Sequence, residues 1–282
     1  MSRRVDGTEV KGLPHFRRVF PYVMRTRTES VIYFPMSVDA EPLLAFLEQR
    51  EQQTGNKDVR LFHVLLSAGI RTLFLRPEMN RFVSGKKIFQ RNEIVIAFVS
   101  KAKFSDEGEE RNVKLSFSGQ ETLEQVAKKV QQAVSISKEE YRKEKSSDDK
   151  DMAFFFSFPS FLRSFVFRFL RFLDHFGWLP AKMVKGEPFF SSVFVTNVGS
   201  IGLDAPFHHL YEWGNTPLFL AVGQIRPQPV VAEDQSIQVR RMMNLRATFD
   251  ERIADGFYCA KSLQLFQQLL EHPEMLENPP TP

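Results

Sequence analysis

The sequence predicts one α/β domain in which helices pack on a mixed β-sheet. Segments with the period of an amphipathic helix alternate with short apolar segments that are typical of strands. The chain has 282 residues, of which 43% are hydrophobic and 26% charged, the composition of an ordinary globular protein. No internal repeat and no linker rich in Gly, Ser or Pro separates two halves. These observations favour a single mixed domain over two smaller ones.

Local signals place the boundaries of the elements. Asp39 can cap a helix that Gly55 ends, and the next helix is apolar on nearly all sides, so we expect it to be buried. We expect a flexible arm over residues 1–14, the domain over 15–275 and a frayed tail over 276–282. The expected helical segments are 15–28, 40–55, 59–77, 121–134 and 257–270, and the expected strands are 29–39, 92–102, 112–118, 188–202, 216–225 and 236–250.

A segment rich in phenylalanine occupies residues 152–180. Ten of the 29 phenylalanines of the chain lie between positions 154 and 176. At helical spacing, one face carries five of them: Phe161, Phe165, Phe169, Phe172 and Phe176. The opposite face carries Arg163, Arg168 and Arg171, and Gly177 ends the helix. This basic amphipathic helix could pack against a neighbouring subunit, line a substrate channel, or contact a membrane surface over residues 154–176. We favour burial against protein, which is the commoner fate of such a stripe.

Composition excludes several classes of function. The formal net charge of +4 and the pI of about 9.1 come from mixed acids and bases, which does not indicate a nucleic acid partner. No zinc-ligand spacing is present, so no metal is expected. Cys259 is the one cysteine; it rules out a disulfide within the chain, fits a reducing cytoplasm, and is expected to be a small helix residue rather than a nucleophile. The N-terminal residues lack the apolar core of a signal peptide, and no stretch is apolar enough to span a membrane.

Three motifs in a fixed order carry a resemblance to a known family. The segments LFHVLLSAGIRTLFLRPEMNRFV, FVTNVGSIGLDAPFHHLYEWGNTPLFLAVGQI and ATFDERIADG resemble the catalytic domain of the dihydrolipoyl acyltransferases of 2-oxo acid dehydrogenases. Chloramphenicol acetyltransferase shares that fold. The resemblance implies a two-layer sandwich that assembles as a homotrimer, with active sites in channels between subunits. In that family a histidine takes a proton from the acceptor, a serine hydroxyl stabilises the oxyanion, and an aspartate holds the loop through an arginine.

Glu251 stands where the resemblance places the catalytic histidine, and Thr196 stands where it places the oxyanion serine. Threonine keeps the hydroxyl donor, which is worth roughly 3 kcal/mol to a developing oxyanion; the alternative is a strand threonine satisfied by its neighbours. An exposed carboxylate is a weaker base than imidazole by about two pKa units, although burial in a dry channel would raise its pKa. Alternatively, Glu251 only forms an ion pair, with Arg252 or with an arginine of another subunit.

Other residues complete the predicted site. His208 or His209 could act as the base instead of Glu251, although adjacent histidines beside aromatic residues are more often structural. Asp255 and Gly256 match the Asp-Gly pair of the family, and we expect Asp255 to cap the last helix. Asn197 and Arg252 are expected to be structural, and three arginines could pair with Asp255: Arg17, Arg18 and Arg25.

The resemblance implies a stand-alone acyltransferase. Only about 14 residues precede the matching region, and they contain no lipoyl-lysine module, so the expected acyl donor is a coenzyme A thioester rather than a covalently bound lipoyl group. The expected acceptor is a small molecule with a thiol, hydroxyl or amine. The replacement of histidine by Glu251 leaves an alternative open: a catalytically inactive trimeric scaffold or ligand-binding protein that retains the acyltransferase fold, in contact with a membrane surface.

Overall fold

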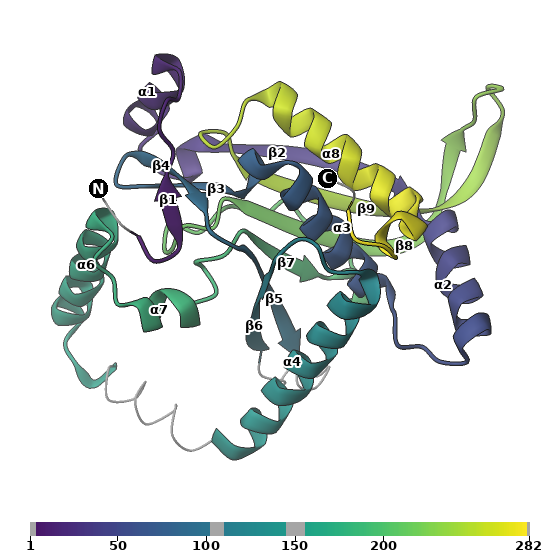
Figure 1. The fold of residues 1–282 in the computed structure, drawn as a ribbon, viewed down its shortest axis with the longest axis horizontal. Helices are drawn as coiled ribbons and strands as arrows, with labels where there is room; N and C mark the ends of the chain where they lie inside the picture. The colour runs from purple at the N-terminus through teal and green to yellow at the C-terminus, as the bar shows by residue number, and fades with distance from the viewer. Residues whose placement is uncertain (1–3, 102–109, 145–155, 281–282) are drawn as a thin grey trace.

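The computed structural model describes residues 4–101, 110–144 and 156–280. Its centre is a six-stranded mixed sheet in which β5, β7 and β8 run parallel and the other neighbouring strands pair antiparallel (Figure 1). In spatial order its strands are β2 (Val31–Asp39), β9 (Ile237–Asp250), β8 (Leu218–Val231), β7 (Val193–Asn197), β5 (Ile94–Lys101) and β6 (Glu110–Phe117). The predicted mixed sheet is confirmed.

Helices form a second layer on one face of this sheet, with the main hydrophobic core between the layers. α3 is central, because most of its residues are buried and it contacts both α4 and α8. The layer contains α2 (Glu41–Thr54), α3 (Leu61–Leu75), α4 (Leu123–Glu144) and α8 (Gly256–Glu271). Gly55 ends α2 in the left-handed conformation, as the sequence predicts. The predicted cap is one residue off: Ala40 is the N-cap residue, and the Asp39 carboxylate before it accepts a hydrogen bond from the Glu41 amide.

The other face of the sheet is covered by the loop that follows the short helical turn Gly199–Ile201. Ala205 and Leu210 of this loop pack on Phe194, Phe219 and other strand residues in a separate, smaller core cluster. The two faces therefore differ: one carries four helices, and the other carries a loop in which the two candidate histidines lie.

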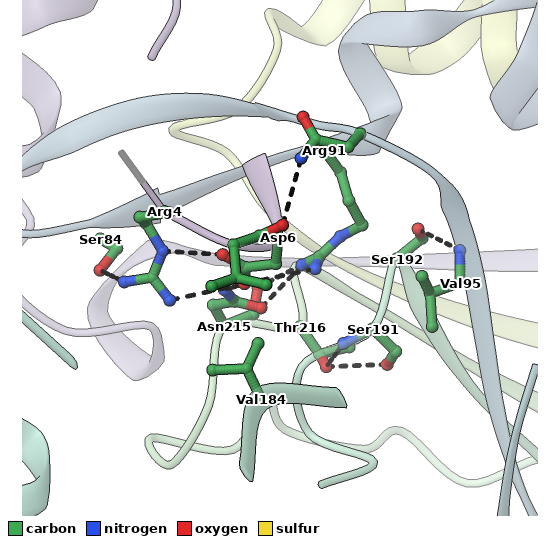
Figure 2. A network of polar contacts seen from close by, with 12 residues as sticks. Arg4, Asp6, Ser84, Arg91, Val95, Val184, Ser191, Ser192, Asn215 and Thr216 are labelled. Carbon is green, nitrogen blue, oxygen red and sulfur yellow. Dashed lines mark hydrogen bonds and ion pairs between the residues drawn. The ribbon is translucent and has the colours of Figure 1, made fainter. Parts of the chain in front are cut away.

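The N-terminal residues do not form a free arm. β1 (Gly7–Glu9) pairs with β4 (Lys87–Arg91), which pairs with β3 (Arg81–Ser84) in a small three-stranded sheet. Arg4 forms an ion pair with Asp6 and donates to the Ser84 hydroxyl (Figure 2). It forms a second ion pair with Asp174. The prediction for residues 1–14 is wrong from Arg4 onward, because a buried arginine that is fully paired anchors this segment; residues 1–3 lie outside the described residues.

The β3–β4 hairpin is absent from the sequence prediction. Its two-residue turn is Gly85-Lys86, and both residues have positive φ angles, 55° and 62°, which matches the mirror-image turn that suits the twist of a hairpin. The C-terminal end also differs from the prediction. Leu276 is buried and the Arg71 guanidinium donates to the Asn278 carbonyl, so the chain is fixed well into the predicted tail of residues 276–282.

The phenylalanine-rich helix is confirmed as α6 (Ser160–Phe176), and Gly177 ends it with a φ of 72°. Two further helices are α1 (His15–Val23) and α7 (Ala181–Gly186). No residue of α6 is buried within this chain, and Phe161 is 74% exposed. The described part of the chain therefore does not bury the phenylalanine face of α6, although burial against protein was expected. The predicted segment at residues 152–155 lies outside the described residues. None of the described helices combines the length and the apolar character that crossing a membrane requires.

Candidate active site

Thr196 lies near the end of β7, beside Ala221 of β8. Side chains alternate along a strand, so Thr196 shares the loop-covered face of the sheet with Phe194. The side chain is partly exposed. Among the described residues nothing hydrogen-bonds its hydroxyl, which contradicts a threonine satisfied by its neighbours and leaves the group able to donate to a ligand.

The turn after Thr196 is fixed by side-chain hydrogen bonds and close backbone packing. The Asn197 amide oxygen accepts a hydrogen bond from the Ser200 amide, and the Ser200 hydroxyl donates to the Asn197 carbonyl. A Cβ at Gly199 would lie 2.3 Å from the Gly223 carbonyl oxygen, so only glycine allows this turn to pack on β8. The predicted structural role of Asn197 is consistent with this geometry.

Glu251 directly follows β9 in a turn. Its amide donates to the Ser30 carbonyl at 2.9 Å, and its side chain is partly exposed. In the described part of the chain the Glu251 carboxylate has neither a hydrogen bond nor an ion pair. An ion pair with Arg252, one of the two alternatives for Glu251, is ruled out because Arg252 has another partner.

Arg252 forms a buried two-bond ion pair with Asp250. Its Nε and Nη2 atoms donate to the two carboxylate oxygens at 2.8 and 2.7 Å, and the side chains are 4% and 1% exposed. Burial lowers the pKa of Arg27, and the charge of Asp250 opposes that effect more than any other nearby charge does. Asp250 was not assigned a role from the sequence, because only its burial reveals one. The predicted structural role of Arg252 agrees with this pairing.

Asp255 caps α8: its carboxylate accepts a hydrogen bond from the Tyr258 amide at 2.8 Å, as expected from the sequence. It forms no ion pair with Arg17, Arg18 or Arg25 among the described residues. Nothing in the described part of this chain lies within 4 Å of a Cβ built at Gly256, so its predicted structural role stays a prediction.

His208 lies over β8, the strand between Thr196 and Glu251. Its ring stacks on Phe219 at a centroid distance of 3.8 Å, and its carbonyl accepts a hydrogen bond from the Thr248 hydroxyl. Its Nδ1 lies 2.7 Å from the His209 carbonyl oxygen; a carbonyl only accepts, so Nδ1 carries the proton and Nε2 is a potential base. Burial lowers the pKa of His208. His209 is exposed and stacks on His208.

Thr196 and Glu251 are far apart within one chain. Thr196 is level with Ala221 and Arg246 across β7, β8 and β9, and Glu251 lies five residues beyond Arg246. With about 3.4 Å per residue along a strand and about 4.8 Å between strands, the two backbone positions are roughly 19 Å apart. One acyl group cannot contact both side chains of the same chain.

One cavity in the described core is small and apolar. A cavity of about 70 Å³ lies between α3, α8 and the sheet, and it is lined almost entirely by apolar residues. Its hydroxyls are satisfied locally, since Thr72 donates to Ala68 and Ser262 donates to Tyr258. Cys259 is also buried in α8, and burial raises its pKa to about 11, so its thiol is not a nucleophile.

Comparison with known proteins agrees with this architecture. Residues 187–277 match the family described as 2-oxoacid dehydrogenases acyltransferase (catalytic domain). This segment is similar to those catalytic domains. The lipoamide acyltransferase component of the branched-chain alpha-keto acid dehydrogenase complex of Pseudomonas putida is 38% identical over 90 residues. That match covers 30% of this chain and 20% of the length of the relative.

Solved structures share the fold over nearly the whole chain. A probable dihydrolipoamide acetyltransferase from Listeria monocytogenes has a TM-score of 0.60 at 17% identity, with 94% of this chain and 95% of that chain covered. A chloramphenicol acetyltransferase has a TM-score of 0.53 at 12% identity, with 94% and 98% covered. The predicted two-layer fold is confirmed, and the matching family segment contains all eight predicted site residues.

Proposed function

We propose that the protein is an acyltransferase that moves an acyl group from a thioester to a thiol, hydroxyl or amine acceptor. The proposal rests on the matching acyltransferase segment together with the chemistry of Thr196 and Glu251. Coenzyme A is the proposed carrier of the acyl group, because it delivers that group as a freely diffusing thioester.

In the proposed reaction, the Glu251 carboxylate accepts a proton while the acceptor attacks the carbonyl carbon of the thioester. The Thr196 hydroxyl donates a hydrogen bond to the resulting oxyanion. Collapse of the tetrahedral intermediate breaks the carbon–sulfur bond, and the proton passes from Glu251 to the departing thiolate. His208, with its unprotonated Nε2, is the second candidate for the base.

The separation of Thr196 and Glu251 carries the central part of the proposal. Each has a polar group without a described partner, each is partly exposed, and they are roughly 19 Å apart within a chain. A site that uses both must therefore combine Thr196 of one copy with Glu251 of another. We propose a homotrimer, in which every copy contributes each residue once.

The β8–β9 ribbon supports assembly with other copies. It projects beyond the body of the molecule (Figure 1), and its outer part carries three strongly exposed apolar side chains: Val231, Ile237 and Val239. Exposed apolar residues on a protruding hairpin favour contact with another chain. The single buried cysteine agrees with a cytoplasmic location, which we also propose.

Turnover of acetyl-coenzyme A with a panel of acceptors tests this function. We expect release of free coenzyme A that depends on the acceptor, and a rate lower by about 100-fold in Thr196→Val, since that change removes an oxyanion donor. Thr196→Ser keeps the hydroxyl and should retain most of the rate. Equal rates in the valine and serine variants would remove Thr196 from the chemistry.

The replacement of histidine by Glu251 favours a second candidate, a catalytically inactive trimeric scaffold or ligand-binding protein. The two functions differ in what Glu251→His does. If the natural protein is inactive and that variant gains acyl transfer, the chain is a binding relative that retained the rest of the site. If the natural protein itself catalyses acyl transfer, it is not an inactive scaffold or ligand-binding protein.

The exposed aromatic face of α6 favours contact with an anionic membrane surface. Phe161, Phe165 and Phe169 are all more than half exposed, and the single acidic residue of α6, Asp174, is paired with Arg4. We expect the protein to float with vesicles of phosphatidylglycerol and phosphatidylcholine, and Phe165→Ser/Phe169→Ser to remain in the dense fraction. A wild-type protein that stays in the dense fraction contradicts membrane contact.

A further inference from the structure

A polar hollow lies between α1, the β3–β4 turn, the C-terminal half of α6 and the loop before β8. Its volume is about 640 Å³, which is in the range of pockets that hold small ligands. Positive side chains dominate its lining, with five arginine or lysine residues against two carboxylates: Arg25, Arg27, Lys86, Arg171 and Arg252; Asp174 and Glu212.

Both carboxylates of the hollow are engaged by other groups. Asp174 accepts a hydrogen bond from Arg4 at 2.8 Å. Arg4 is itself buried and donates to Ser84 (Figure 2), which lines the hollow. Glu212 accepts hydrogen bonds from the amide and the hydroxyl of Thr28 at 2.9 and 2.8 Å. Neither acid forms an ion pair with a cation that lines the hollow.

Three of the cations have no ion-pair partner among the described residues: Arg25 on the segment after α1, Lys86 in the β3–β4 turn and Arg171 on α6. Arg27 donates to the carbonyls of Tyr211 and Glu212, and nearby carboxylates offset part of its charge, while Arg252 is paired with Asp250. The excess positive charge of the hollow therefore comes from Arg25, Lys86 and Arg171.

Close packing holds two of these cations on the same hollow. A Cβ at Gly85 would lie 2.3 Å from the His175 carbonyl oxygen, so the β3–β4 turn lies directly against the end of α6. Lys86 is the next residue in that turn, and Arg171 lies one turn before His175 on α6. Cations from separate elements thus converge without needing a rearrangement of the backbone.

We propose that this hollow binds a phosphate monoester or a pyrophosphate group. Such a group carries more than one negative charge and offers several acceptor oxygens, and arginine recognises it with two parallel N–H donors. A monocarboxylate would leave most of the positive charge uncompensated. The inference concerns binding alone and does not depend on acyl transfer, although Arg252 places the hollow next to Glu251 in the chain.

Isothermal titration calorimetry with inorganic pyrophosphate and with coenzyme A tests the site. We expect binding by the wild-type protein, and affinity lower by at least about tenfold in Lys86→Gln/Arg171→Gln, because two charged donors are lost. Lys87→Gln/Arg168→Gln removes the same charge at nearby positions that do not line the hollow. The loss of the exposed ion pair between Lys87 and Glu9 in this control should cost less than about 1 kcal/mol. All four side chains are exposed, so both variants should fold.

A second arm of the experiment identifies the source of the phosphate. Sedimentation with vesicles of phosphatidic acid and phosphatidylcholine tests a lipid headgroup, with phosphatidylglycerol vesicles as the diester control. Binding to phosphatidic acid that is lost in Lys86→Gln/Arg171→Gln also supports the site. Equal affinities of the two double variants for every probe, or no binding of any phosphate probe by the wild type, would overturn it.

Discussion

We expect replacement of Glu251 by glutamine to lower the proposed acyl-transfer rate by about 100-fold to 10,000-fold, the usual contribution of a general base. Glutamine has nearly the same shape as glutamate but cannot accept the proton. The side chain is partly exposed and has no described partner, so its replacement should not disturb folding. The measurement is the steady-state rate of coenzyme A release at saturating acyl donor.

Glu233→Gln is the matched control for this experiment. It makes the same chemical change on an exposed residue near the tip of the β8–β9 ribbon, and we expect an unchanged rate. Should Glu251→Gln and Glu233→Gln be equally active, Glu251 is not the base. If His208→Gln then lowered the rate while both glutamate variants did not, the role of base would belong to His208. The Nδ1–H of His208 is already oriented by the His209 carbonyl.

Asp250→Ala destabilises the protein by about 3 to 5 kcal/mol, because it leaves the buried guanidinium of Arg252 without its carboxylate. Asp250 also accepts a hydrogen bond from the Arg252 amide, and its charge favours the protonated form of the buried Arg27. The loss is measured as a shift of the urea unfolding midpoint at constant slope.

Glu51→Ala provides the comparison, because it breaks an exposed ion pair with Lys57 and should cost less than about 1 kcal/mol. Asp250→Asn should fall between wild type and alanine, since it keeps an acceptor but loses the charge. If Asp250→Ala and Glu51→Ala shift the midpoint equally, the buried ion pair does not hold the turn that carries Glu251.

Local sequence signals predicted the elements well where one residue determines the outcome. Gly55 and Gly177 end their helices in the left-handed conformation, and Asp255 caps α8. The turn Gly85-Lys86 carried a similar signal, but the short strands on either side of it were too brief to show alternation. Strand periodicity needs several residues to become visible.

Long-range contacts were not predictable from the sequence in the same way. Arg4 is anchored by Ser84 and Asp174, and those partners are separated from it by 80 and 170 residues. From the sequence alone, the charged N-terminal segment was therefore predicted to be exposed to solvent. The pairing of Arg252 with Asp250 rather than Glu251 likewise depends on which carboxylate is buried, and alternation along β9 directs Asp250 inward only once the sheet is known.

The sequence predicted which residues form the candidate site, and the structure adds the distance between them. The motifs identified Thr196 and Glu251, but they could not show that two strand spacings and five residues lie between them. The structure also adds the basic hollow beside Arg252, whose cations come from four distant segments. Neither feature follows from the order of residues along the chain.

Mixing two inactive variants tests the account most directly. Thr196→Val and Glu251→Gln are unfolded together, refolded as a mixture and assayed for acyl transfer, with each variant refolded alone as the control. If the site combines Thr196 of one copy with Glu251 of another, mixed assemblies contain sites in which both residues are intact, and activity returns well above either variant alone. Activity in the mixture that does not exceed the average of the two separate variants would contradict a site shared between copies.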